Sequence, residues 1–92
     1  MANPLRKQLY LGAADRISDP ARWTRGLKGV LWPSYKACAM GALYLVGKRL
    51  GLTRQQVSSI VGPDRQRTII TINDRHGRLP VIKYLRDQAA TL

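Results

Sequence analysis

The sequence predicts an all-α fold, a single small domain of about five short helices over residues 1–92. Three observations support this prediction. Pro and Gly residues divide the chain into about five segments, most with apolar residues at helical spacing. Good N-capping residues precede several of these segments. Apolar residues make up 45% of the chain, which is enough for one core without a disulfide.

The first predicted helix runs from Pro4 to Ser18. Asn3 suits the N-cap and Pro4 the first helical position. Apolar residues recur at every fourth position and form one stripe, which comprises Leu5, Leu9, Ala13 and Ile17.

The Asp19-Pro20 pair has the form of a second cap followed by Pro, so a short helix that carries Trp23 is expected. The glycines that follow loosen the backbone. Residues 27–33 are compatible with a loop or with a short extended segment, and the sequence does not decide between them. Pro33 ends this segment, because a residue before Pro avoids the helical region.

A third helix is predicted over Tyr35–Leu50, with Ser34 as its cap and Gly51 as its stop. This segment is apolar on nearly all sides, which places it in the middle of the domain. Small residues along it, Ala37, Gly41, Ala42 and Gly47, allow neighbouring helices to approach closely.

The next segment opens with a capping box, because Thr53 is followed three residues later by Gln56. The helix that it starts should end near Gly62.

Residues 65–75 are ambiguous between helix and strand. Thr68 to Ile72 are β-branched, which favours a strand. Alternation is poor, however, and on a helix Ile69, Ile70 and Ile72 share one arc. We therefore predict a helix over 65–75, closed by Gly77. Asn73 falls inside the apolar arc, so its amide is expected to bind the Gly77 turn or a neighbouring helix end.

The last predicted helix runs from Pro80 to about Ala90. Its inner face comprises Val81, Ile82, Leu85 and Ala89, and its outer face Lys83, Arg86 and Asp87.

The charge balance is the strongest functional signal. The chain has 16 Lys and Arg against five acidic residues, all Asp, for a net charge of +11. A surface this positive attracts polyanions, of which nucleic acid is the commonest in a cell. The basic residues are spread along the chain, so they do not form a basic tail.

The chain is expected in a bacterial or host cytosol. Cys38 is the only cysteine, so no disulfide can form within the chain. The first residues do not have the pattern of a signal peptide. The longest apolar stretch, Ala37–Gly47, is too short to span a bilayer, which needs about 20 residues.

The order of several short motifs resembles a family of small, uncharacterised proteins from actinobacteria and their phages. The residues that match are Trp23 with Gly26, then Cys38, Gly41, Ala42 and Leu43, then Asn73 and Asp74, then Arg78 before the last helix. Ile72 and Leu79 depart from the family's Trp and Thr. The resemblance implies a helical fold and an actinobacterial or phage origin, and it supplies no activity for this chain.

The segments on either side of Gly62 are typical of a helix-turn-helix. The helix opened by Thr53 would support a recognition helix over 65–75, with Gly62-Pro63-Asp64 as the turn. Two ordinary packed helices with a Gly-Pro corner explain the same pattern, and the turn is one residue too long for the motif.

We therefore expect a basic face that binds DNA, built from Lys48, Arg49, Arg54, Arg65, Arg67, Thr68, Thr71, Arg75 and Arg78. The alternative is an interaction protein that binds and modulates an acidic host protein. The sequence leaves open whether the chain forms a homodimer.

Catalysis has little support. Cys38, His76 and Asp74 could form a nucleophile, a base and an orienting group. Cys38 lies in the most apolar segment, however, where an inert buried thiol is usual. The sequence contains no metal-ligand spacing, P-loop or dinucleotide fingerprint, so we predict a protein that is not an enzyme and needs no cofactor or metal.

Overall fold

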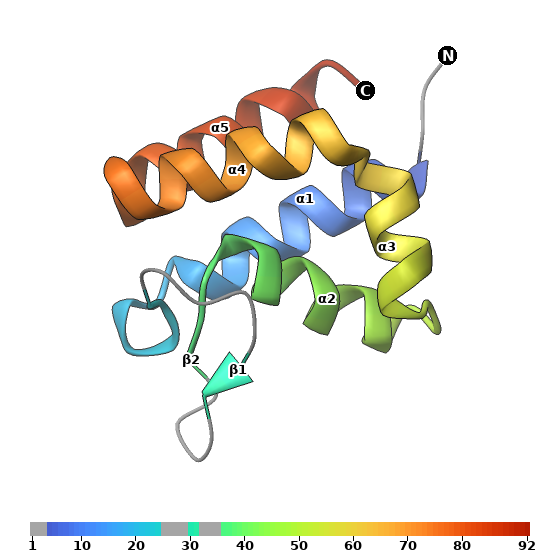
Figure 1. The fold of residues 1–92 in the computed structure, drawn as a ribbon, viewed down its shortest axis with the longest axis horizontal. Helices are drawn as coiled ribbons and strands as arrows, with labels where there is room; N and C mark the ends of the chain where they lie inside the picture. Colours follow the sequence, from blue (N-terminus) through green and yellow to red (C-terminus); the bar gives the residue numbers. More distant parts are fainter. Residues whose placement is uncertain (1–3, 25–29, 32–35) are drawn as a thin grey trace.

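The computed structural model of the chain describes residues 4–24, 30–31 and 36–92. They form an all-α, single small domain, which confirms the predicted fold class (Figure 1). The five α-helices are α1 (Pro4–Ile17), α2 (Ala39–Arg49), α3 (Arg54–Val61), α4 (Pro63–Arg75) and α5 (Arg78–Ala90). A 3-10 turn, η1 (Pro20–Arg22), follows α1. Two-residue strands β1 (Val30–Leu31) and β2 (Lys36–Ala37) pair antiparallel.

Helix α1 is the central element of the fold. It lies between α2 on one side and the α4–α5 hairpin on the other, and α3 joins these two layers at one end (Figure 1). The sequence had predicted the central position for the segment ending at Leu50. Helix α1 buries more than its predicted stripe, because Tyr10 and Ala14 are fully buried beside Leu9. Leu5, at the start of that stripe, is 40% exposed.

The predicted bounds of α1 are confirmed to within one residue, and its candidate cap Asn3 lies outside the described residues. The predicted short helix after Asp19 is the η1 turn, but it ends at Arg22 and does not include Trp23, which is extended and follows the turn as its C-cap. The N-cap of the turn is the Asp19 carboxylate, which accepts a 3.0 Å hydrogen bond from the amide of Ala21.

The prediction of a helix from Tyr35 is wrong at its start, because α2 begins only at Ala39. Lys36–Ala37 instead pair with Val30–Leu31. Cys38 is extended and caps α2, since its Sγ accepts from the amide of Gly41 at 3.4 Å. This cap fixes the helix start. The predicted cap Ser34 lies outside the described residues, as does most of segment 27–33.

A close approach of two helices depends on Gly47, as its small size predicted. A Cβ atom at this position would lie 2.2 Å from Cγ2 of Val57, which is too close for two carbon atoms that are not bonded to each other. The missing side chain therefore lets α3 pack directly on α2.

The capping box at α3 is confirmed in both directions. The amide of Gln56 donates to Oγ1 of Thr53 at 3.1 Å, and the amide of Thr53 donates to Oε1 of Gln56 at 2.8 Å. Gly62 ends the helix with φ +88°, a conformation that favours glycine.

The ambiguous segment is a helix, as predicted. Helix α4 buries Ile69 and Asn73. Gly77 closes it with φ +95° and also serves as the N-cap of α5. The predicted inner face of α5 is buried at all four positions, Val81, Ile82, Leu85 and Ala89. Within the described residues, no helix is both long and apolar enough to span a membrane.

Candidate nucleic-acid interface

The outer face of α4 presents basic and hydroxyl side chains to solvent. Arg67, Thr71 and Arg75 follow one another at four-residue spacing and are all exposed, while Ile69 and Asn73 occupy the buried side. At 1.5 Å of rise per residue, Arg67 and Arg75 are about 12 Å apart along the axis. A helix with this distribution can lay two guanidinium groups and a hydroxyl along one surface.

The connection between α3 and α4 differs from the predicted turn. Gly62 alone separates the two helices, because Pro63 and Asp64 already form the first turn of α4. Pro is suited to that position since it lacks the amide hydrogen that a first helical residue leaves unbonded. The predicted three-residue turn over Gly62–Asp64 is therefore wrong. The connection between α3 and α4 is shorter than the turn of a helix-turn-helix.

Three ion pairs join the described residues, and none of them uses an arginine of α4. They are Asp19–Arg22, Asp87–Lys83 and Asp15–Arg86. Among the described residues, seven exposed cations make no such pair: Lys7, Lys48, Arg49, Arg54, Arg65, Arg67 and Arg75. These positive charges are not neutralised by a contact within this part of the chain.

A second basic group surrounds the corner between α2 and α3. It comprises Lys48 and Arg49, in the last turn of α2, and Arg54, the first residue of α3. Cζ of Arg54 lies 4.5 Å from the centre of the Tyr44 ring, an arrangement that holds the guanidinium in place. Tyr44 is itself fixed, because its hydroxyl lies 3.1 Å from Oγ of Ser58.

No carboxylate side chain occurs in the sequence around this corner. Residues 20–63 contain no Asp or Glu but seven basic residues, Arg22, Arg25, Lys28, Lys36, Lys48, Arg49 and Arg54. Burial lowers the pKa of the Arg16 guanidinium, and the positive charges of Arg22 and Arg49 lower it further. The guanidinium groups of Arg22 and Arg49 therefore lie near enough to that of Arg16 to repel it.

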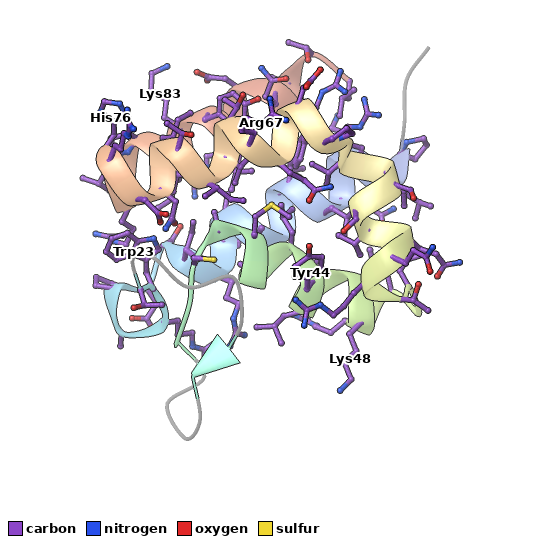
Figure 2. The ribbon with its side chains drawn as sticks, viewed as in Figure 1. Trp23, Tyr44, Lys48, Arg67, His76 and Lys83 are labelled. Atoms are coloured by element: carbon purple, nitrogen blue, oxygen red, sulfur yellow. The ribbon has the colours of Figure 1, made fainter. Side chains whose placement is uncertain are left out.

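The predicted site residues fall into two groups and one separate residue. The α2–α3 corner holds Lys48, Arg49 and Arg54, and α4 carries Arg65, Arg67, Thr68, Thr71 and Arg75. Figure 2 shows Lys48 at the opposite edge of the view from His76 and Lys83, with Arg67 on α4. Thr68 is exposed, and its hydroxyl donates to the carbonyl of Asp64 at 3.1 Å.

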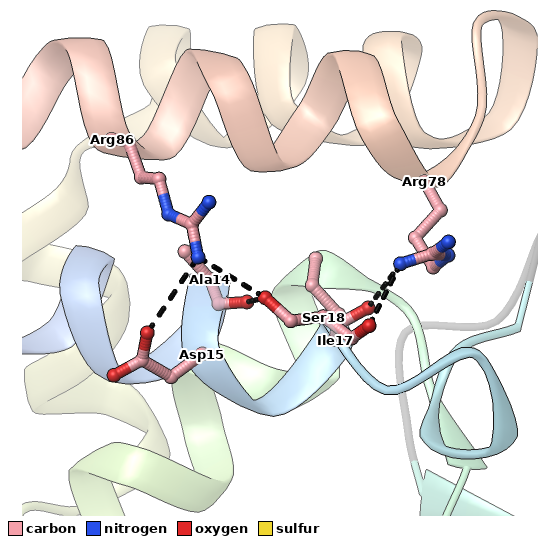
Figure 3. Close-up of polar contacts among 6 residues, drawn as sticks. All are labelled: Ala14, Asp15, Ile17, Ser18, Arg78 and Arg86. Atoms are coloured by element: carbon pink, nitrogen blue, oxygen red, sulfur yellow. Dashed lines mark hydrogen bonds and ion pairs between the residues drawn. The ribbon is translucent and has the colours of Figure 1, made fainter.

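Arg78 is the separate residue, because its side chain is engaged inside the fold. It is half-buried, and its Nη1 donates to the carbonyls of Ile17, at 3.5 Å, and Ser18, at 2.9 Å (Figure 3). These carbonyls lie at the end of α1, where the helix has no amide partners for them. Arg78 thus acts as a C-terminal cap for α1.

The residues considered for catalysis do not form an activated nucleophile. The Cys38 thiol is 4% exposed, and burial raises its pKa, as does the negative charge of Asp74. A thiol in this environment stays protonated and unreactive at neutral pH. His76 is exposed at the end of α4. Among the described residues, no group of three or more His, Cys, Asp or Glu side chains could hold a metal ion.

Sequence reasoning missed the Tyr44–Arg54 contact and the binding of Arg6 to α3. Nε of Arg6 donates to the carbonyl of Ile60 at 3.0 Å, across 54 residues of sequence. No local pattern signals such a contact, because it depends on how α1 and α3 meet.

Comparisons with known proteins gave no match to a family model, to a curated protein or to a solved structure. The resemblance to actinobacterial and phage proteins stays a prediction.

Proposed function

We propose that the chain binds nucleic acid, chiefly through the phosphate backbone, with the outer face of α4 as its principal contact. The observation that carries this proposal is that, of the seven exposed cations without ion pairs among the described residues, six lie on α4 or at the α2–α3 corner. Guanidinium groups at Arg67 and Arg75 suit phosphate oxygens, because each can donate two parallel hydrogen bonds. Thr71 between them adds a hydroxyl donor.

Backbone contact fits this surface better than base reading does. Phosphate contacts supply affinity and position, whereas base contacts supply specificity. The one-residue connection between α3 and α4, at Gly62, does not reproduce the turn that presents a recognition helix to the major groove. The α2–α3 corner adds Lys48, Arg49 and Arg54 as a second group for a long polyanion.

Fluorescence anisotropy with two 20-base-pair duplexes of unrelated sequence tests this function. We expect both duplexes to bind at 50 mM salt with affinities within about threefold of each other, because a backbone contact carries no sequence information. A K48Q/R49Q/R54Q variant measures the contribution of the corner. Absence of binding to either duplex would end the proposal, and a large preference for one duplex would favour base reading by α4.

A further inference from the structure

The two basic groups lie on different layers of the fold. Helix α1 separates α2 from the α4–α5 hairpin, and the α2–α3 corner belongs to the layer of α2 (Figure 1). In Figure 2, Arg67 lies on α4, whereas Lys48 lies at the lower edge of the view with its side chain directed away from the fold. The positive charges of the two groups are therefore presented on opposite sides of the domain.

The outer face of α4 is directed away from the α2 layer. Oδ1 of Asn73 accepts a 3.0 Å hydrogen bond from the amide of Ala39, the first residue of α2. Arg75, two residues further along the helix, projects about 200° around its axis from Asn73. Arg67 has the same relation to the buried Ile69. A duplex bound to these two arginines therefore lies on the side of α4 that faces away from α2.

The α2–α3 corner has the properties of a second phosphate-binding surface. Its three cations are exposed and make no ion pair among the described residues: Lys48, Arg49 and Arg54. No acidic residue occurs in the sequence between Asp19 and Asp64. The Tyr44 ring, whose centre lies 4.5 Å from Cζ of Arg54, restricts this guanidinium before any ligand binds. A side chain that is restricted in advance loses less entropy on binding.

One straight duplex does not reach both surfaces. Double-stranded DNA has a persistence length of about 150 base pairs, so a segment of about 20 base pairs behaves as a rod. The chain measures 36 × 26 × 21 Å along its principal axes, and such a rod would have to bend sharply to follow it from one side to the other. A second duplex segment, in contrast, can meet the corner without any deformation.

We propose that the chain bridges two duplex segments, with the outer face of α4 on the phosphate backbone of one and the α2–α3 corner on that of the other. This inference rests on the nucleic-acid function proposed above and adds a second binding surface to it. Bridging needs only one copy of the chain, because each molecule carries both surfaces. Phosphate is the ligand of both surfaces, so neither of them selects a sequence.

Retention of a fluorescent duplex on beads that carry an immobilised duplex of unrelated sequence tests this proposal. At about 50 mM salt, where phosphate contacts are strong, the unchanged chain should retain the fluorescent duplex. A K48Q/R54Q variant should retain about tenfold less, because the second surface loses two charged donors. The affinity of this variant for a single duplex, measured by anisotropy, should stay within about threefold, because the principal contact on α4 is intact.

A K7Q/R86Q variant is the matched control, since it removes two exposed positive charges that belong to neither surface. It should retain the fluorescent duplex nearly as well as the unchanged chain. An R67Q/R75Q variant should lose both retention and affinity for a single duplex, because it removes the principal surface.

The outcomes separate this inference from the function on which it rests. Binding in anisotropy without retention on the beads would overturn bridging and leave nucleic-acid binding in place. Equal retention by K48Q/R54Q and K7Q/R86Q would overturn the role of the corner and make a pair of chains the bridge. A single strand of 40 nucleotides that binds about tenfold more tightly than the duplex would show one flexible strand across both surfaces instead. Absence of all binding would overturn both proposals.

Discussion

Nε1 of Trp23 donates a 2.8 Å hydrogen bond to Oδ1 of Asn73, fifty residues further along the chain. Asn73 is 1% exposed, and the same oxygen accepts from the amide of Ala39 at 3.0 Å. Nδ2 of Asn73 donates to the carbonyl of Thr24 at 3.4 Å and to the Asp74 carboxylate at 3.1 Å. One buried amide on α4 therefore binds the start of α2 and the segment after η1.

Replacing Asn73 with Ala should lower the free energy of unfolding by about 2–4 kcal/mol, because the donors of Trp23 and Ala39 lose their acceptor in a buried environment. Urea denaturation followed by circular dichroism measures this change. Thr71→Ala, on the exposed side of the same helix, is the control and should change stability by no more than about 0.5 kcal/mol. Equal effects of the two substitutions would contradict the role assigned to Asn73.

Gly47→Ala should lower the free energy of unfolding by about 1–3 kcal/mol, because the new Cβ would overlap Val57. Val57→Ala alone should also destabilise, since it leaves a cavity in the core. In the double variant the smaller side chain at 57 makes room for the methyl group at 47. The combined loss should therefore be smaller than the sum by about 1 kcal/mol or more. Additive losses would show that the two helices do not meet as closely as this contact requires.

Arg78 and Arg86 both bind the end of α1 but should differ in their contribution to stability (Figure 3). Arg78→Gln removes a half-buried charged donor from two backbone carbonyls and should cost about 1–2 kcal/mol. Arg86→Gln should cost no more than about 0.5 kcal/mol, because its 3.8 Å ion pair with Asp15 is exposed. Both variants lose one positive charge, so thermal denaturation compares them directly. The account fails here if Arg86→Gln is the more damaging change.

Stability should fall as the pH rises above neutral, because burial raises the pKa of both Cys38 and Tyr10. The folded chain holds these protons more tightly than the unfolded chain does. The stabilisation is complete below the ordinary pKa of each group, about 8.5 for Cys and 10 for Tyr, and is lost as the pH rises through the raised folded value. Urea unfolding from pH 7 to about 10 measures the loss from Cys38, and its extension to about pH 11 adds the loss from Tyr10.

Cys38→Ser is the control for the thiol, because its hydroxyl keeps an acceptor for the amide of Gly41. This variant should lose less stability than the unchanged chain between pH 8 and about 10. Identical pH profiles for the two proteins would contradict a raised thiol pKa.

Local patterns in the sequence predict most of the helices correctly. The capping box at Thr53 and the glycines at 62 and 77 mark helix ends because their signals depend on neighbours in sequence. The start of α2 is missed because it depends on strand pairing and on Asn73, which caps Ala39 from another helix. The central position of α1 also depends on tertiary packing, since α1 contacts both α2 and α5 and Tyr10 is fully buried in the folded chain.

The candidate site is predictable only in part. Helical spacing places Arg67, Thr71 and Arg75 on one exposed face, which the structure confirms. The sequence does not show that Arg78 would bind carbonyls of α1, because their partners are 60 and 61 residues away. For the same reason it does not show that the predicted basic residues would divide between α4 and the α2–α3 corner.

The salt dependence of duplex binding tests the central claim most directly. Each phosphate contact contributes about 0.9 to the slope of log affinity against log salt. An R67Q/R75Q variant should therefore show a slope smaller by about 1.8 than that of the unchanged chain. A K7Q/R86Q variant loses the same charge away from the outer face of α4 and should leave the slope nearly unchanged. Equal slopes for R67Q/R75Q and the unchanged chain would contradict a nucleic-acid interface on α4.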